Sequence, residues 1–290
     1  MDFGFLITGL LTGLREGVEA ALIVSIILAY LAKTGNRRHF GKIWLGTGAA
    51  IAISVGVGVI LFNTIGGFGE PAEQIFEGFA MLIAAGVVTW MLFWMRRAAA
   101  SIKGQLHAGV DRALMEGGLF GLALLAFTAV IREGIETALF LMGQATAAGT
   151  EATSTLIGAI IGLLIAIGIG YALYRGARII NLRTFFNWTG VALIFIAAGL
   201  LSHSLHEFIE IGWISVGTAT AFDISGILSH EDNLLGQMLR AIFGYTSTPE
   251  WMTFLAWLVY IGSVLGLYLR PARAADRRPG SMPAETAPNV

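Results

Sequence analysis

The sequence predicts an all-α polytopic membrane protein whose helices form a bundle. Of its 290 residues, 56% are hydrophobic and only 13% are charged, and the mean hydropathy is +0.76. A soluble domain carries about 25% charged residues, so this chain has too few polar groups to cover a surface exposed to water. The apolar runs are long and continuous, whereas the strands of a membrane barrel alternate apolar and polar residues. Helices are therefore the only spanning elements that fit.

Seven segments are long and apolar enough to cross the hydrocarbon core, which takes about 20 residues. They cover residues 3–31, 42–64, 73–95, 117–142, 154–174, 186–207 and 250–269. Basic connections stay on the cytoplasmic side, and 15 of the 18 basic residues lie in the first, third and fifth connections and in the C-terminal tail. We therefore expect a multi-pass protein of the cytoplasmic (plasma) membrane with its N-terminus outside and its C-terminus inside.

The remaining segments have their own signals. The N-terminus lacks the basic stretch of a signal peptide, so we expect it to be retained. The sixth connection, about 208–249, is expected on the outside. It contains a possible capping box at 229–232, an amphipathic pattern from Leu234 to Phe243 and a stop at Gly244. Residues 1–270 are thus expected to form the transmembrane domain, and the tail at 271–290 is expected to be disordered in the cytoplasm.

Composition also excludes several functions. The net charge is -1 and there is no basic block, so nucleic acid is not expected as a partner. The chain has no cysteine, which rules out disulfides, thiolate metal sites and thiol nucleophiles. Its three lysines, Lys33, Lys42 and Lys103, lie at cytoplasmic connections, so no span offers a lysine for a retinal Schiff base.

Two arginines lie inside the predicted spans, and each opens the same motif. The first copy runs from Arg15 as Arg-Glu-Gly-Val-Glu and the second from Arg132 as Arg-Glu-Gly-Ile-Glu, 117 residues later. This offset covers three spans, an odd number, so the copies face opposite directions across the membrane. The pattern predicts inverted repeats of three helices, at about 1–100 and 113–210, with the seventh helix appended.

The motif glutamates are candidate metal ligands near the middle of the membrane. At about 1.5 Å per residue, Glu16 lies ~20 Å and Glu133 ~25 Å along their helices. Residues at i and i+3 share a helix face, which pairs Glu16 with Glu19 and Glu133 with Glu136.

The surroundings of these acids admit two interpretations. We expect Gly17 and Gly134 to let the two helices approach closely, and Gly9, Gly13 and Gly17 form a stripe of small residues. Arg15 and Arg132 could simply staple each motif to the carboxylates of the other helix. Ion pairs that only hold the helices together do not require two acids for each base, however. A cation site does require this excess of negative charge.

A second set of metal-ligating side chains lies toward the predicted outer side. These residues open the third span or close the sixth, and they are Glu73, Glu77, His203, His206, Glu207 and Glu210. Histidine and carboxylate side chains are common metal ligands, so the set predicts an outer vestibule for a metal cation. Alternatively, these groups are solvated charges at helix ends, and Glu73 and Glu77 complement a helix N-terminus.

The paired motifs resemble the signature of the oxidase-dependent iron permease family, which includes fungal high-affinity iron permeases and bacterial EfeU-type permeases. The resemblance extends to Glu77-Gly78 and to His206-Glu207-Phe208. It implies that residues 1–270 are a permease domain that imports iron, with metal handled by the four motif glutamates. It also implies an extracytoplasmic iron-binding protein and an oxidase or peroxidase as separate partners. The chain is then a transporter, not an enzyme, with iron as cargo and no tightly bound cofactor.

Other functions remain open at this point. A divalent metal cation/proton exchanger would share the inverted repeats and the buried acids, because carboxylates suit iron, especially ferric iron, but also other hard cations. An intramembrane di-metal oxidase is less favoured, because such sites use Glu-x-x-His pairs and neither motif helix contains histidine. A ligand receptor would not need buried acids in inverted repeats. No Walker pattern is present, so we expect transport to draw on a gradient, a partner or the redox chemistry of the metal.

Overall fold

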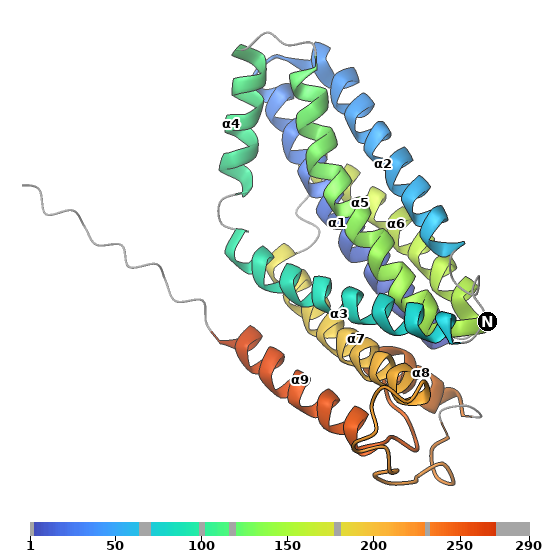
Figure 1. Cartoon of the computed structure of the whole chain (residues 1–290). Helices are drawn as coiled ribbons and strands as arrows, with labels where there is room; N and C mark the ends of the chain where they lie inside the picture. The colour runs from blue at the N-terminus through green and yellow to red at the C-terminus, as the bar shows by residue number, and fades with distance from the viewer. Residues whose placement is uncertain are drawn as a thin grey trace, which may run out of the picture.

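The computed structural model describes residues 3–63, 71–98, 102–115, 120–176, 181–229 and 233–270, and these are almost entirely helical. Figure 1 shows the long helices lying side by side as a bundle. The helices are α1 (Phe3–Lys33), α2 (Phe40–Phe62), α3 (Ala72–Ala98), α4 (Ile102–Met115), α5 (Gly121–Ala148), α6 (Ala152–Tyr174), α7 (Leu182–Glu210), α8 (Leu234–Phe243) and α9 (Trp251–Leu269). Short 3-10 helices precede α2 (Arg37–His39) and α6 (Gly149–Glu151).

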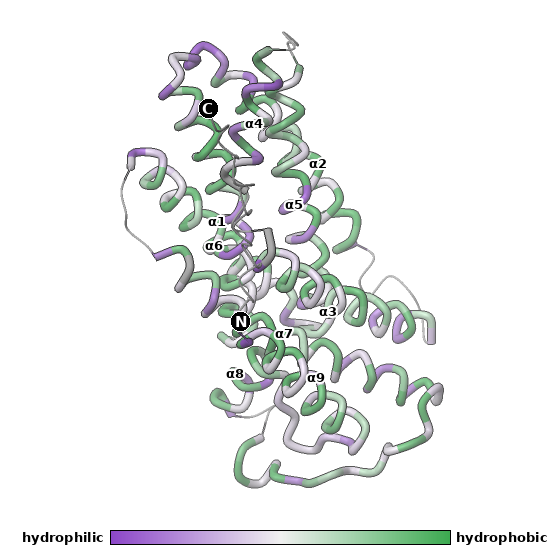
Figure 2. The backbone as a smooth tube through the Cα atoms, turned by 90° about the vertical axis from the view of Figure 1, so that its left-hand side faces the viewer, coloured by the Kyte–Doolittle hydropathy of each residue, from purple (hydrophilic) through white to green (hydrophobic). Residues whose placement is uncertain are grey.

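Five of the described segments have the length and composition to cross a membrane. They are Arg37–Phe62, Ala72–Arg96, Gly121–Tyr174, Thr184–Glu210 and Trp251–Leu269, and the third contains both α5 and α6. Helix α1 is as long as these, but it carries three charged motif residues. Figure 2 shows hydrophobic character along most of the helical length. Many large apolar side chains of α2, α6 and α9 are exposed, as expected where a surface contacts lipid, so the chain is a multi-pass membrane protein.

The helices match the predicted segments, with shifts at their ends. A helix lies at each of the seven predicted positions, but α5 continues to Ala148 where the prediction ended at 142. The amphipathic helix is α8, and Gly244 ends it in the left-handed conformation with φ 68°. Asn233 caps α8 by accepting a hydrogen bond from the backbone of Leu235. Residues 230–232 of the capping box predicted at 229–232 lie outside the described residues, as does the tail at 271–290.

Helix α4 was not predicted and corrects the sequence analysis, which treated 96–116 as a simple connection. Its apolar residues recur every four positions, at Ile102, Leu106, Val110 and Leu114. Leu106 and Val110 are buried in a cluster with α1, α2 and α5. The phenol of Tyr30 on α1 donates to the carboxylate of Asp111 at 2.7 Å, so α4 is tied to the end of α1.

Glycine contacts show that α1 packs on α6 in the same way that α5 packs on α2. A Cβ on Gly158 would meet the backbone of Leu6, and one on Gly46 would meet that of Ala123. Likewise Gly17 faces Ala166 as Gly134 faces Ser54, and Gly170 faces Ala21 as Gly58 faces Ala138. The three contacts follow one rule: the α5 residue lies 117 positions after its α1 counterpart, and the α2 residue lies 112 positions before its α6 counterpart. The residue numbers rise together along each helix pair, so both pairs are parallel.

The short helices extend this correspondence. Gly4 on α1 lies against Ala241 of α8, and Gly121, which is 117 residues later on α5, lies against Ala113 of α4. Each motif helix is therefore covered near its first turn by a short helix, α1 by α8 and α5 by α4.

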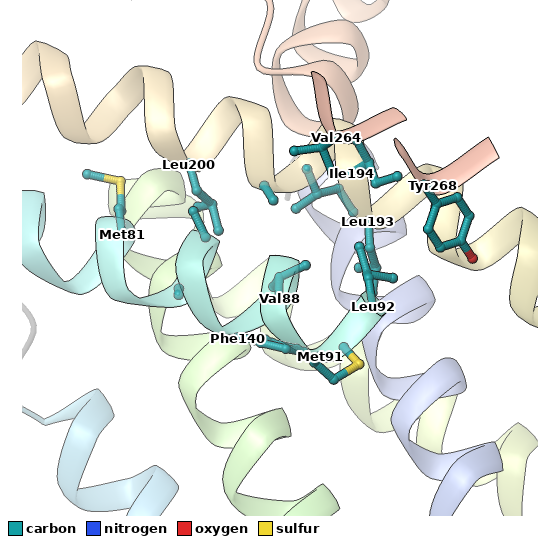
Figure 3. Packing of buried hydrophobic residues seen from close by; sticks show 14 residues of the cluster. Met81, Val88, Met91, Leu92, Phe140, Leu193, Ile194, Leu200, Val264 and Tyr268 are labelled. Carbon is teal, nitrogen blue, oxygen red and sulfur yellow. The ribbon is translucent and has the colours of Figure 1, made fainter. Parts of the chain in front are cut away.

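A second packing core holds α3, α7 and α9 against α5. Its buried side chains come mainly from α3 and α7, with Phe140 from α5 and with Val264 and Tyr268 from α9. Figure 3 shows Val88, Met91 and Leu92 of α3 within this cluster. Because Met91 belongs to both the core and the surroundings of Arg15, the core positions α3 beside the first motif.

Candidate metal site

The two Arg-Glu-Gly-x-Glu motifs meet where α1 and α5 cross. One carboxylate oxygen each from Glu16, Glu19 and Glu133 lies within 4.8 Å of the other two. These side chains are 1%, 4% and 1% exposed. Glu136 is 6% exposed and lies near enough to interact electrostatically with Glu16. Among the residues that the structure describes, no other group of three or more acids or histidines is this compact.

Each arginine pairs with the glutamates of its own motif. Arg15 contacts Glu16 at 2.5 Å (Nη1 to Oε1) and Glu19 at 3.1 Å (Nη2 to Oε1). Arg132 contacts Glu133 at 2.5 Å (Nη2 to Oε1) and Glu136 at 3.5 Å (Nε to Oε1). The alternative in which the arginines staple the two motif helices together is therefore wrong for this arrangement.

The two arginines have different surroundings although their motifs match. The side chain of Arg15 is 2% exposed, and its Nη2 lies 2.9 Å from the sulfur of Met91 and 3.2 Å from that of Met95. The side chain of Arg132 is 36% exposed, and its guanidinium stacks 4.0 Å from the ring centroid of Trp94. All three neighbours belong to α3, which therefore breaks the symmetry of the site.

One carboxylate oxygen of each motif glutamate is buried without a hydrogen-bond partner and is not the oxygen that contacts the arginine. This oxygen is Oε2 in Glu16, Glu19, Glu133 and Glu136, whereas Oε1 of Glu19 lies 3.1 Å from Arg15 Nη2. Buried polar atoms are nearly always hydrogen-bonded, because an unpaired one costs about 1–3 kcal/mol. Oxygens of this kind are the ligands that hard cations prefer.

The spacing of the carboxylates of Glu16, Glu19 and Glu133 suits a metal ion after a small contraction. An ion at the centre of three oxygens within 4.8 Å of one another lies at most about 2.8 Å from each. Oxygen ligands bind small divalent cations at about 2.0–2.2 Å. If the glutamate side chains turn so that each carboxylate oxygen moves by less than about 1 Å, the site closes around one ion.

The acids of the predicted outer set gather where the start of α3 meets the end of α7. The hydroxyl of Ser204 donates to the carbonyl of Gly78 at 2.7 Å, and the ring of Phe208 fills the space beside Gly78. Glu207 interacts electrostatically with other acids of the set, namely Glu73, Glu77 and Glu210. These four carboxylates share one end of the molecule without forming a compact group.

The two histidines of that set lie in different places. His206 contacts Glu250 at 2.8 Å through Nδ1 and Glu210 at 3.4 Å through Nε2. Sequence reasoning missed Glu250, whose only signal was its position just before the last helix. His203 instead bonds the carbonyl of Gly199 at 3.0 Å and lines a cavity away from His206.

That cavity lies where α1, α5, α7 and α8 meet, and its volume of about 20 Å³ holds about one water. Its polar lining residues are Thr8, Gln144, His203 and Arg240. Gln144 Nε2 donates to the hydroxyl of Thr12 at 2.8 Å. Thr8, Thr12 and Gln144 were not among the residues predicted from the sequence. One signal was available, because Thr8, Thr12, Glu16 and Glu19 recur on one face of α1.

The motif glycines allow a different close approach from the predicted one. Gly17 lies against Ala166 of α6, and Gly134 lies against Ser54 of α2. They therefore bring α1 close to α6 and α5 close to α2, rather than α1 close to α5. The predicted stripe of small residues on α1 does pack closely, because Gly9 and Gly13 face the backbone of Thr155 and Ala159.

The chain is similar to known transport proteins over most of its length. The pattern of the iron permease FTR1 family matches residues 6–272. The ferrous iron permease EfeU of Escherichia coli O6:H1 is 38% identical over 271 residues, which cover 93% of this chain and 97% of that protein. The EfeU proteins of Shigella sonnei (38% over 263 residues, 90% and 94%) and Yersinia pestis (37% over 265 residues, 90% and 92%) are similar to the same extent. No solved structure matches the chain.

Proposed function

The chain belongs to the iron permease FTR1 family, and on that basis we propose that it imports iron across the cytoplasmic membrane through the four motif glutamates. The observation that carries this proposal is the set of four buried carboxylate oxygens without hydrogen-bond partners, one from each motif glutamate, where α1 crosses α5. Such a site stabilises a cation in transit and has no evident structural purpose. The chain acts as a transporter rather than an enzyme, with the iron ion as its cargo.

The charge of the site suits one divalent ion. Four carboxylates and two guanidiniums have a formal charge of -2 when all are ionised. In a low-dielectric interior a net charge is costly, so the empty site favours a counter-ion of charge +2. The similar proteins are named ferrous iron permeases, which makes Fe²⁺ the first species to test. Arg15 and Arg132 neutralise half of the acids until the ion arrives.

The proposed topology has seven spans, with the N-terminus outside and the C-terminus inside. It adds α1 to the five apolar segments and counts α5 and α6 separately. The cost of the three charged residues of α1 is offset inside the bundle, where they pair with one another. The basic residues of the first, third and fifth connections then lie in the cytoplasm.

Inverted repeats, α1–α3 with α4 and α5–α7 with α8, would place the glutamates at the centre of the membrane. The matched glycine contacts of α1 with α6 and of α5 with α2 support this relation. The crossing of the two motifs supports it as well. A pseudo-two-fold axis that exchanges the repeats passes midway between equivalent residues, and the two motifs meet in this way where α1 crosses α5. Transporters built in this way bind their cargo at the repeat interface and move one repeat against the other.

The outer acids and His206 form the vestibule in this proposal. Four carboxylates at the junction of α3 and α7 raise the local concentration of cations before the ion reaches the motif glutamates. An extracytoplasmic iron-binding protein and an oxidase or peroxidase, as the family resemblance implies, would supply iron at this face.

Iron uptake by glutamate variants tests the proposal. Glu16→Gln and Glu133→Gln keep the shape of the side chain but remove its charge, and each is expected to lower iron uptake at least tenfold in cells without another iron importer. Glu151→Gln is the matched control, because Glu151 lies between α5 and α6 outside the cluster. The amount of each variant in the membrane is measured in parallel.

Two outcomes of this assay would count against the proposal. Uptake near the wild-type rate in both glutamate variants would remove the motifs from the pathway. Equal uptake of manganese and iron, driven by an imposed proton gradient, would favour the general divalent cation/proton exchanger.

A further inference from the structure

A continuous line of polar side chains leads from the cavity beside α8 to the motif glutamates. Thr8, Thr12 and Glu16 lie one turn apart on the same buried face of α1, and they are 1%, 0% and 1% exposed. From Thr8 to Glu16 the distance along the helix is about 12 Å. Helix α8 lies over the first turn of α1 at Gly4, so the cavity occupies the outer end of this line in the proposed topology.

Gln144 connects the cavity with the next turn of the line. Its side chain is 4% exposed and lines the cavity. The amide nitrogen donates to Thr12, which leaves the amide oxygen buried without a hydrogen-bond partner. If Gln144 served only to hold α5 against α1, its buried oxygen would have no purpose, and leaving that oxygen without a hydrogen bond costs about 1–3 kcal/mol of stability.

We propose that Gln144 and Thr12 form an uncharged metal-binding step between the outer cavity and the motif glutamates. The proposal rests on the proposed function and adds a second site to the same pathway. Amide and hydroxyl oxygens are ligands for hard cations. The cavity holds about one water, so an ion in it must already have lost most of its hydration shell, and Gln144 Oε1 replaces part of that shell.

The charges on either side of this step favour inward movement. Arg240 of α8 lines the outer side of the cavity, while the motif glutamates lie inward with a formal charge of -2 after pairing with both arginines. A cation is therefore repelled from the outer side of the cavity and attracted toward Glu16. An uncharged ligand between them holds the ion without trapping it, so the ion can move on to the carboxylates.

Two substitutions at Gln144 separate a ligand from a structural clamp. Gln144→Met keeps the size of the side chain and removes both polar atoms, whereas Gln144→Glu keeps the oxygen ligands and removes the amide donor to Thr12. A metal ligand predicts opposite effects on iron uptake. Gln144→Met raises the KM about tenfold, and Gln144→Glu leaves it at or below the wild-type value. Thr155→Val is the control, because that buried hydroxyl on α6 also has no partner but does not line the cavity.

The measurement is the initial rate of iron uptake into proteoliposomes over a range of iron concentrations. A rise in KM of similar size in both Gln144 variants would show a clamp and overturn the proposal, as would a wild-type KM in both. If Gln144→Met does not fold, Gln144→Glu alone decides, because a clamp predicts a raised KM and a ligand does not. Loss of uptake in Glu16→Gln with no change in either Gln144 variant would refute only this inference and leave the proposed function standing.

Discussion

Replacement of the two motif arginines is expected to have unequal effects, although the motifs are alike in sequence. Methionine at position 15 or 132 keeps a long unbranched side chain with similar helix propensity and removes the charge. In Arg15→Met, Glu16 and Glu19 lose a partner that is 2% exposed. Removing one member of a buried ion pair costs about 3–5 kcal/mol, because the remaining charge is left uncompensated.

The same change at Arg132 is expected to cost less. Its side chain is 36% exposed and stacks on Trp94. Water that reaches the exposed part of the side chain then screens part of the lost pairing, and we expect a cost of about 1–2 kcal/mol. The predicted difference between the variants is about 2 kcal/mol, which corresponds to a Tm difference of roughly 4–8 °C for a chain of this size.

Thermal unfolding of the purified protein in detergent, followed by tryptophan fluorescence, measures this difference. Combining Arg15→Met with Glu19→Gln should recover part of the lost stability, since the second change removes an unpaired charge. Equal Tm values for the two arginine variants, or a lower Tm for Arg132→Met, would refute the reasoning from burial.

Three further predictions concern packing, topology and the vestibule. Gly134→Ala places a methyl group against Ser54 and is expected to destabilise the protein by about 1–3 kcal/mol. Adding Ser54→Gly to this variant should restore the melting temperature. The control is Gly48→Ala, which should not lower the melting temperature because Gly48 faces open space. The chain has no cysteine, so in intact cells a membrane-impermeant thiol reagent should label Gly226→Cys from outside and Thr34→Cys only after the membrane is opened; the reverse pattern would contradict the orientation. His206→Gln should raise the KM for iron uptake a few-fold without lowering the maximal rate, whereas a lower maximal rate at unchanged KM would place His206 outside the vestibule.

The glutamate cluster could be predicted from the sequence because the repeat is explicit there. Two charged motifs in apolar helices, separated by an odd number of spans, imply that equivalent residues face each other across the repeat interface. The structure brings three of the four predicted carboxylates within 4.8 Å of one another. Periodicity also predicted where the long helices lie, because an apolar run of 20 residues has few alternatives in a membrane.

Other features depend on contacts that a single sequence does not encode locally. Arg15 and Arg132 differ only because α3 places Met91 beside one and Trp94 beside the other. Gln144 has no unusual sequence context, and its role follows from the unpaired oxygen beside the cavity. Helix α4 was missed because polar residues dilute its apolar pattern, which recurs only every fourth residue.

The position of bound iron tests the central claim most directly. Anomalous diffraction from crystals of the iron-loaded protein, recorded at the iron absorption edge, locates the ion without reference to transport. The account predicts a peak at the crossing of α1 and α5, about 2.0–2.2 Å from oxygens of Glu16, Glu19 and Glu133, and the loss of this peak in Glu16→Gln and Glu133→Gln. Iron bound elsewhere in the bundle, or an unchanged peak in both variants, would contradict it.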